Sequence, residues 1–435
     1  MASSNKNARF EALKIRDFRI FWLGQGISSI GTEMQKVAID WNVFQLLRGE
    51  VYDLSLFGWD VSLDSGALGL GAIGLVRVFP IMIFALLGGI LADTIERRKL
   101  LIWSEGLSAV FAAALAILVF SGYETVGLLY LISALLAAST SVSTPTRQAL
   151  VPNLVPRNLM TNAVSLNSLL FQVGSIAGPA LAGLLIAFAD NSSTVYFVNA
   201  LSFFGAIVSL IMMRHRSKAA ASEEVSFEMV KEGLRFTYNE KTLWGSMLLD
   251  FFATLFGSAR TMLPIIAVEV LGLDAQGYGI LVTAQPLGAF ITGFTMAWIR
   301  DLKNQGKIML IGVGVYGVAT ALFGISPFFA LSYFFFAMTG VGDTVSMVIR
   351  QTMRQVVTPD RLRGRATSIS MVFFMGGPQL GEAEAGLVAA AFGAPFAILS
   401  GGLAVVVMTG WVAWRFPRLR EYDPNLKEYS YNTDE

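Results

Sequence analysis

Twelve long apolar segments constrain the fold of this chain more than any other feature of its sequence. Each is long enough to form a helix that crosses the hydrocarbon core of a bilayer, which is about 30 Å thick. They cover residues 20–47, 67–92, 100–121, 126–145, 160–188, 195–213, 244–270, 278–299, 308–326, 328–349, 366–392 and 395–414. Only 14% of the 435 residues are charged, whereas water-soluble domains average roughly 25%. The sequence therefore predicts an all-α membrane protein with twelve transmembrane helices.

An internal repeat relates the two halves of the chain. Arg147-Gln148, Gly174, Gly178 and Gly183 recur 203 residues later as Arg350-Gln351, Gly377, Gly381 and Gly386. One gap-free repeat near half the chain length predicts two related halves rather than a solenoid. We expect a six-helix bundle at 20–213 and another at 244–415. Segments 1–19 and 416–435 then form cytoplasmic termini, and the polar segment 214–243 forms a cytoplasmic linker with an amphipathic helix.

The distribution of positive charge predicts the orientation in the membrane. Of the 32 lysines and arginines, 28 lie in the termini and the alternate loops on one side, and the opposite loops contain only Arg48. The remaining three, Lys36, Arg77 and Arg260, are predicted inside spans. By the positive-inside rule, both termini are cytoplasmic. We expect a multi-pass protein of the cell inner membrane.

The composition also excludes several kinds of chemistry. The chain has no cysteine, which excludes thiol catalysis, thiolate metal sites and disulfides. Its single histidine, His215, lies in a basic loop. The sequence contains no metal-ligand cluster, Walker loop or nucleophile elbow. We therefore expect a chain that is not an enzyme, with no metal, no cofactor and no nucleic-acid partner.

Three segments carry a resemblance to a transporter family. Segment 89–98, with Gly89, Asp93, Arg97 and Arg98, resembles the loop signature of the major facilitator superfamily, although Thr94 and Glu96 depart from its usual basic residue and glycine. Segment 174–183, with Gly174, Gly178, Pro179 and Gly183, resembles the antiporter signature of that superfamily. Segment 31–41 is similar to the first span of its branch of siderophore and drug exporters.

The resemblance implies the major facilitator fold, with two six-helix bundles that rock around a central cavity. The first, fourth, seventh and tenth helices of such a fold line the cavity. The second, fifth, eighth and eleventh form the contact between the bundles. The resemblance further implies a monomeric secondary transporter that lies in the lipid bilayer and moves a small-molecule substrate. Asp93 is expected to lie against the N-terminus of the eleventh helix, near residues 365–368.

Charged residues inside the predicted spans are the candidates for coupling to protons. A charge at the bilayer centre costs at least about 2.5 kcal/mol and normally faces water or a partner. Glu382 is the leading candidate because it replaces Pro179 of the first repeat copy. The other proton candidates are Glu33, Asp40, Asp343 and Glu384, and the candidate partners of substrate or charge are Lys36, Arg77 and Arg260.

A structural interpretation of some of these charges stays open. Glu33, Lys36 and Asp40 share one helix face and can neutralise one another. Asp250 and Glu269 are placed near span ends, where a carboxylate reaches the interface, and Glu105 is interpreted as structural.

These observations favour a proton-coupled exporter of a small amphipathic compound, either a siderophore or a drug-like molecule. An importer or facilitator on the same fold is one alternative. A non-transporting sensor or scaffold is another, but a scaffold would not need so many charges on the predicted cavity helices.

Overall fold

The computed structural model describes residues 8–56, 59–214, 227–299, 302–359 and 363–423, which form two compact units. Unit 1 comprises Met1–Leu46, Phe79–Glu223 and Asp274–Thr283. Unit 2 comprises Leu47–Val78, Glu224–Leu273 and Ala284–Glu435. Each unit thus contains most of one half of the chain and a short segment from the other half.

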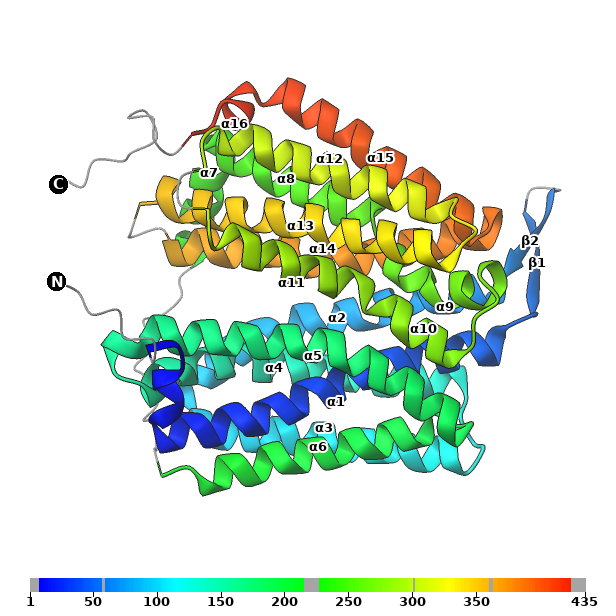
Figure 1. Cartoon of the computed structure of the whole chain (residues 1–435), viewed down its shortest axis with the longest axis horizontal. Helices are drawn as coiled ribbons and strands as arrows, with labels where there is room; N and C mark the ends of the chain where they lie inside the picture. The colour runs from blue at the N-terminus through cyan, green and yellow to red at the C-terminus, as the bar shows by residue number, and fades with distance from the viewer. Residues whose placement is uncertain (1–7, 57–58, 215–226, 300–301, 360–362, 424–435) are drawn as a thin grey trace. The chain divides into compact units, whose positions relative to one another are not determined.

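Unit 1 is helical. Its elements are η1 (Ala8–Lys14), α1 (Arg16–Leu47), α3 (Arg97–Phe120), α4 (Val126–Leu154), η2 (Arg157–Leu159), α5 (Met160–Ala189), α6 (Ser193–Met212) and α10 (Ala275–Val282). α3 packs against both α6 and α4, and α10 packs along α5 (Figure 1). A core at one end of the unit includes Phe18, Leu101, Leu154 and Leu210, all less than 7% exposed.

Unit 2 combines a hairpin with the second set of helices. Its elements are β1 (Val51–Leu56), β2 (Trp59–Asp64), the first part of α2 (Ser65–Thr94), α7 (Phe227–Asn239), α8 (Lys241–Phe256), η3 (Ala259–Met262), α9 (Leu263–Ile265), the π-helical η4 (Ile266–Val270), α11 (Ala284–Met296), α12 (Gln305–Gly324), α13 (Phe329–Val357), α14 (Arg363–Phe392), α15 (Ala394–Arg415) and α16 (Pro417–Arg420). α12 packs against α13 and α15, and α14 packs against α8 (Figure 1).

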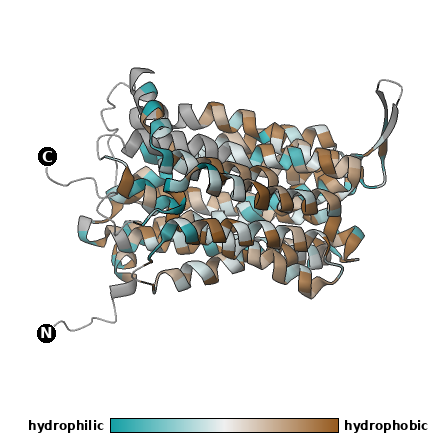
Figure 2. Cartoon of the chain, turned by 90° about the horizontal axis from the view of Figure 1, so that it is seen from above, coloured by the Kyte–Doolittle hydropathy of each residue, from teal (hydrophilic) through white to brown (hydrophobic). Residues whose placement is uncertain are grey.

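Within the described residues, ten helical segments are long and apolar enough to cross a membrane. Hydrophobic residues recur along the helices among paler and hydrophilic ones (Figure 2). The other two predicted spans correspond to α1, which carries several charged residues, and α14. α7 occupies the linker, where an amphipathic helix was expected.

Two of the predicted spans are interrupted in the structure. The seventh ends as α8 at Phe256 and continues as the short elements η3, α9 and η4. At the break, the hydroxyl of Tyr316 donates a 2.7 Å hydrogen bond to the carbonyl of Gly257, which replaces a helical partner. The eighth span is divided into α10 and α11 around Thr283. Pro286 explains this division, because proline has no amide hydrogen to donate to the preceding helical turn.

The hairpin between α1 and α2 is the departure from an all-α chain among the described residues. Its antiparallel strands pair from Val51 with Asp64 to Leu56 with Trp59. The strands were not predicted, although segment 59–64 alternates apolar and polar residues and comes directly after Gly58 in the sequence. The hairpin projects beyond the helix ends of unit 2 (Figure 1).

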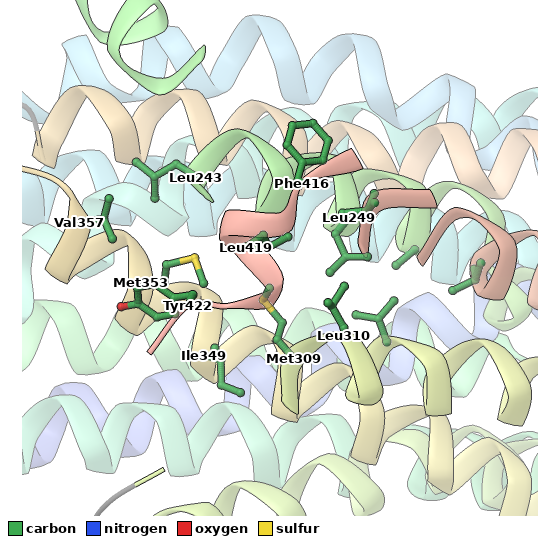
Figure 3. Packing of buried hydrophobic residues seen from close by; sticks show 14 residues of the cluster. Leu243, Leu249, Met309, Leu310, Ile349, Met353, Val357, Phe416, Leu419 and Tyr422 are labelled. Carbon is green, nitrogen blue, oxygen red and sulfur yellow. The ribbon is translucent and has the colours of Figure 1, made fainter. Parts of the chain in front are cut away.

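The segment after α15 lies in the core of unit 2. Leu419 and Tyr422 have no exposed surface, and Figure 3 shows them among Leu243, Met309 and Met353. The backbone N–H of Gly306 donates to the carbonyl of Tyr422 at 3.0 Å, and that of Asn304 donates to the carboxylate of Asp423 at 2.9 Å. Residues 416–423, assigned to a tail from the sequence, therefore connect α8, α12 and α13.

Candidate functional site

The glycines of the antiporter-like motif allow other helices to approach α5 closely. A Cβ atom added at Gly178 would lie 2.6 Å from Cβ of Glu33 and 3.0 Å from the carbonyl oxygen of Ile30, both on α1. One added at Gly183 would lie 2.6 Å from the carbonyl oxygen of Ala275 on α10. Gly174 faces Ser29 of α1 at an ordinary distance of 3.4 Å. The motif therefore fits α5 between α1 and α10 within unit 1.

The second copy of this motif does the same within unit 2. Cβ atoms added at Gly377 and Gly381 would collide with Thr254 of α8. One added at Gly386 would lie 2.9 Å from the carbonyl oxygen of Ala67 on α2. In both copies, the first two glycines contact the first helix of their own half and the third contacts a helix from the other half. The predicted contacts of the fifth helix with the eighth, and of the second with the eleventh, are therefore present.

Glu382 lies at the contact between α14 and α2. A Cβ atom added at Gly74 would lie 2.7 Å from Cβ of Glu382 and 3.1 Å from its Oε2. The absence of a side chain at Gly74 thus creates the space that the half-buried carboxylate occupies. In the first copy, the carbonyl of Pro179 packs against Gly279 in the same way, but without a side chain that can carry charge.

Two other predicted residues flank this contact. Arg77 follows Gly74 by three residues on α2, which places it about one turn further along the helix. Glu384 is half-buried on α14, about 200° around the helix from Glu382. The half-buried Arg260 lies in η3, directly after the break that ends α8.

The predicted neutralisation on α1 is confirmed for one pair. Nζ of Lys36 lies 2.6 Å from Oε1 of Glu33. Glu33 is only 6% exposed, whereas the Lys36 side chain is 45% exposed. Glu33 therefore has a counter-charge in this structure. Asp40 follows one turn later and is partly buried.

A charged cluster in unit 2 was not predicted as a unit. Nη2 of Arg350 lies 2.7 Å from Oδ1 of Asp250, and Nη1 of Arg350 donates to Oγ of Ser346 at 3.0 Å. The two charged side chains are only 12% and 14% exposed. Asp343, on the same helix, is within electrostatic range of Arg350, Asp250 and Tyr316.

This cluster corrects two predictions about the ends of spans. Asp250 was expected to reach the membrane interface, but it pairs with Arg350 nine residues into α8. Arg350 was counted in a loop because the apolar segment ends at residue 349, and α13 in fact continues to Val357. Arg147 was misplaced for the same reason, since α4 continues to Leu154. Lys36, Arg77 and Arg260 are therefore not the only cations within the helices.

The repeat-related position in unit 1 holds a similar arginine. Arg147 donates to Oγ of Ser143 at 3.1 Å, just as Arg350 does to Ser346, and its other nitrogen donates to Oε1 of Gln25 at 2.8 Å. Glu105 is 2% exposed, accepts a 3.3 Å hydrogen bond from Ser28 and interacts electrostatically with Arg147. Unit 1 thus has the neutral Gln25 where unit 2 has Asp250. The recurrence of Arg-Gln was visible in the sequence, but its connection to α1 and α8 was not.

The loop motif is described only in part. Nη1 of Arg97 donates to the carbonyl of Ala149 at 2.9 Å, and Nη2 of Arg98 donates to that of Ile211 at 2.8 Å. Both arginines therefore bind carbonyls near the C-terminal ends of helices, where positive charge is favourable. Gly89 and Asp93 belong to the last turns of α2, and the burial and contacts of these two residues lie outside the described part of the structure. The predicted position of Asp93 against the eleventh helix stays a prediction.

The described residues contain no group of three or more histidine, aspartate or glutamate side chains able to hold a metal ion. The arrangement consists instead of carboxylates and arginines at helix contacts, together with glycines that bring helices close.

A family model matches nearly the whole chain. Residues 7–433 match the model of the transmembrane secretion effectors of the major facilitator superfamily. The chain belongs to this family of membrane transporters.

The curated relatives of this transporter include siderophore exporters. It is 25% identical over 369 residues to the enterobactin exporter EntS of Shigella boydii serotype 18. The aligned residues cover 85% of this chain and 84% of that exporter. The enterobactin exporter EntS of Salmonella typhi is 24% identical with the same coverage. These matches support the siderophore-exporter branch to which segment 31–41 pointed.

Solved structures show the same fold at much lower sequence identity. The peptide transporter POT in complex with sulfate has a TM-score of 0.68 and 13% identity, with 92% of this chain and 94% of that chain covered. A bacterial homolog of the human lysosomal transporter Spinster, inward-facing and occupied, has a TM-score of 0.70 and 12% identity, with 96% and 98% covered. The major facilitator fold is therefore shown for this chain.

Proposed function

We propose that this transporter exports a small amphipathic compound, a siderophore or a drug-like molecule, across the cell inner membrane in exchange for protons. The observation that carries the proposal is the carboxylate of Glu382, which lies at a helix contact against Gly74. An ionisable group in a membrane-spanning helix is costly and usually serves transport. The names of the enterobactin exporters support export as the direction.

In the proposed mechanism, Glu382 binds a proton in one access state and releases it in another. The α2–α14 contact is close, since Gly71 and Gly386 leave no room for side chains between the helices. A charged Glu382 favours an open contact with water or a cation nearby, and a neutral Glu382 favours a closed one. Alternating access then couples the proton gradient to movement of substrate. Glu33, Asp40, Asp343 and Glu384 are the other carboxylates available for this role.

Substrate recognition is assigned to the cationic side chains within the helices. Lys36 is nearly half exposed, and Arg77 and Arg260 are half-buried. Each can bind an anionic or polar group of an amphipathic compound while the surrounding apolar residues bind the rest. No ATP-binding motif occurs in the sequence, which favours secondary transport.

Gating is assigned to the loop motif on the cytoplasmic side. Asp93 is proposed to stabilise one access state at the N-terminus of the eleventh helix, with Arg97 and Arg98 fixed on helix carbonyls beside it. This assignment requires that the loop motif and both termini lie on the cytoplasmic side of the membrane. In intact cells, an impermeant thiol reagent should label a cysteine at the exposed Ser121 and not one at the exposed Asn239. The reverse labelling would contradict this orientation.

Transport into inside-out membrane vesicles tests the proposed function. With a panel of siderophores and drugs and a pH gradient that is acidic inside, at least one compound should accumulate, and collapse of the gradient should abolish the accumulation. Movement that equilibrates without a gradient would favour the facilitator alternative, and uptake in the opposite direction would favour an importer. Absence of transport for every compound, together with binding of one of them, would favour a sensor.

A further inference from the structure

The charged cluster of unit 2 contains more ionisable groups than one ion pair requires. Asp250 pairs with Arg350, whereas Asp343 forms no side-chain hydrogen bond or ion pair within the part of the chain that the structure describes. Arg354 follows Arg350 by one turn and acts electrostatically on both Arg350 and Asp250. The cluster thus has two carboxylates and two guanidinium groups, but only one close pair.

The geometry of α13 places three of these groups in one row. Asp343, Arg350 and Arg354 are separated by seven and four residues, so they fall within about 40° of one another around the helix. Side chains on a helix tilt toward its N-terminus. Arg350 already extends in that direction, since it donates to Ser346 one turn earlier. A further movement along the same row brings it toward Asp343, and Arg354 can then replace it at Asp250.

We propose that Asp343 is a proton-binding site whose occupancy is set by a one-turn shift of Arg350 and Arg354 along α13. In the first state, Arg350 pairs with Asp250 and Asp343 holds a proton. In the second, Arg350 pairs with Asp343, Arg354 pairs with Asp250, and the proton from Asp343 has left to water. One proton is released per shift, and each carboxylate is either paired or neutral in both states. The proposal rests on the proposed proton coupling and identifies a second site for it beside Glu382.

Comparison with unit 1 supports this assignment. The position that corresponds to Asp343 in the repeat is Thr140, whose hydroxyl donates to the carbonyl of Leu136 at 2.6 Å. Gln25 takes the place of Asp250 beside the arginine. Asp250 and Asp343 thus have neutral counterparts in unit 1, where the carboxylate that acts on Arg147 is Glu105 of α3. The arginine–serine contact itself forms in both units, so it does not require the two aspartates.

The groups that surround Asp343 are few. Asp250 faces it from α8 and Tyr316 from α12, where the Tyr316 hydroxyl is already donated to Gly257. α11 packs along α13 and has no titratable side chain between Ala284 and Met296. On α14 the described titratable groups are Glu382 and Glu384. Arg350 is therefore the cation in position to stabilise a charged Asp343.

Infrared difference spectroscopy of the purified full-length protein across a pH series tests the proposal without any substrate. Besides any band from Glu382, the parent should show a carboxylic-acid C=O band of Asp343 that disappears as the pH rises. Asp343→Asn should abolish this band, and Asp250→Asn should abolish it too, because Arg350 is then free to pair with Asp343. Arg354→Gln should retain the band to a higher pH than the parent, since Asp250 then has no replacement partner. Asp190→Asn, in an exposed loop where the left-handed backbone suits asparagine, should retain the parental band.

An unchanged spectrum for Asp343→Asn would overturn the proton site, and an unchanged band for Asp250→Asn would overturn the shift of Arg350. Loss of the band in Asp190→Asn would also count against the proposal, because the band would then not report Asp343. If Asp343→Asn does not fold, Asp250→Asn and Arg354→Gln decide the question. A titrating Asp343 band in a protein that fails to transport would disprove the proposed function alone. Proton-coupled transport with no such band would disprove this inference alone.

Discussion

Replacement of Arg350 by glutamine is expected to lower the free energy of unfolding by about 3–5 kcal/mol, the usual effect of removing one partner of a buried ion pair. The pair is mostly buried, with Arg350 and Asp250 at 12% and 14% side-chain exposure and 2.7 Å between their charged atoms. Without the guanidinium, Asp250 is left in a helix with its main counter-charge removed. The change should be measured by equilibrium unfolding of the purified protein in mixed micelles, followed by circular dichroism.

Two comparisons separate loss of the ion pair from general disruption. The double variant Asp250→Asn with Arg350→Gln removes both charges, so it should be more stable than Arg350→Gln alone. Arg235→Gln, at an exposed position of α7, should change the stability by less than about 0.5 kcal/mol. If Arg350→Gln is as stable as the parent, the contact with Asp250 does not stabilise unit 2.

Glu382→Gln is expected to abolish proton-driven transport while the protein still folds and binds substrate. Glutamine keeps the volume and much of the hydrogen-bonding shape of the protonated acid, so it fits the space that Gly74 leaves. It cannot release a proton, and the coupled cycle therefore stops in the neutral form. Gradient-driven uptake into proteoliposomes should fall to background, and substrate-induced proton release in weak buffer should lose the contribution of Glu382.

Glu384→Gln is the matched control for this prediction. It makes the same chemical change two residues away, on a face of α14 that differs by about 200°. Its effect on transport should be much smaller. Parental proton release and transport by Glu382→Gln would instead make Glu382 a structural residue. The proton would then have to be carried by Glu33, Asp40, Asp343 or Glu384.

The sequence was sufficient to predict the helices but not their interruptions. Long apolar segments and a 203-residue repeat depend only on composition and order, so the positions of the helices and the relation between the halves were predictable. The break after Phe256 was not, because the hydroxyl that binds the carbonyl at the break belongs to Tyr316, which lies far along the chain. The hairpin was missed because a search for long apolar segments gives no weight to six-residue strands.

The candidate site was predictable where it depends on the repeat. Glu382 differs from Pro179 in an otherwise matching pair, and its position against a glycine of α2 agrees with a role at a helix contact. The pairing of Glu33 with Lys36 followed from helical spacing. The ion pair between Arg350 and Asp250 could not be predicted in this way, since no rule of local spacing relates two residues on different helices. The hydropathy pattern also hid this pair, because Arg350 ends an apolar segment of the sequence, whereas the helix α13 continues beyond it.

The burial of Leu419 and Tyr422 has a consequence for biosynthesis. Their side chains complete a core formed by α8, α12 and α13, all of which precede them in the chain. During translation these helices emerge with a gap at one end, which remains unfilled until residues 416–422 have left the ribosome. Quality-control proteases that recognise incompletely packed membrane proteins therefore have a period in which to distinguish finished chains from interrupted ones. A chain that stops at the end of α15 would keep all of its spans and still lack this part of its core.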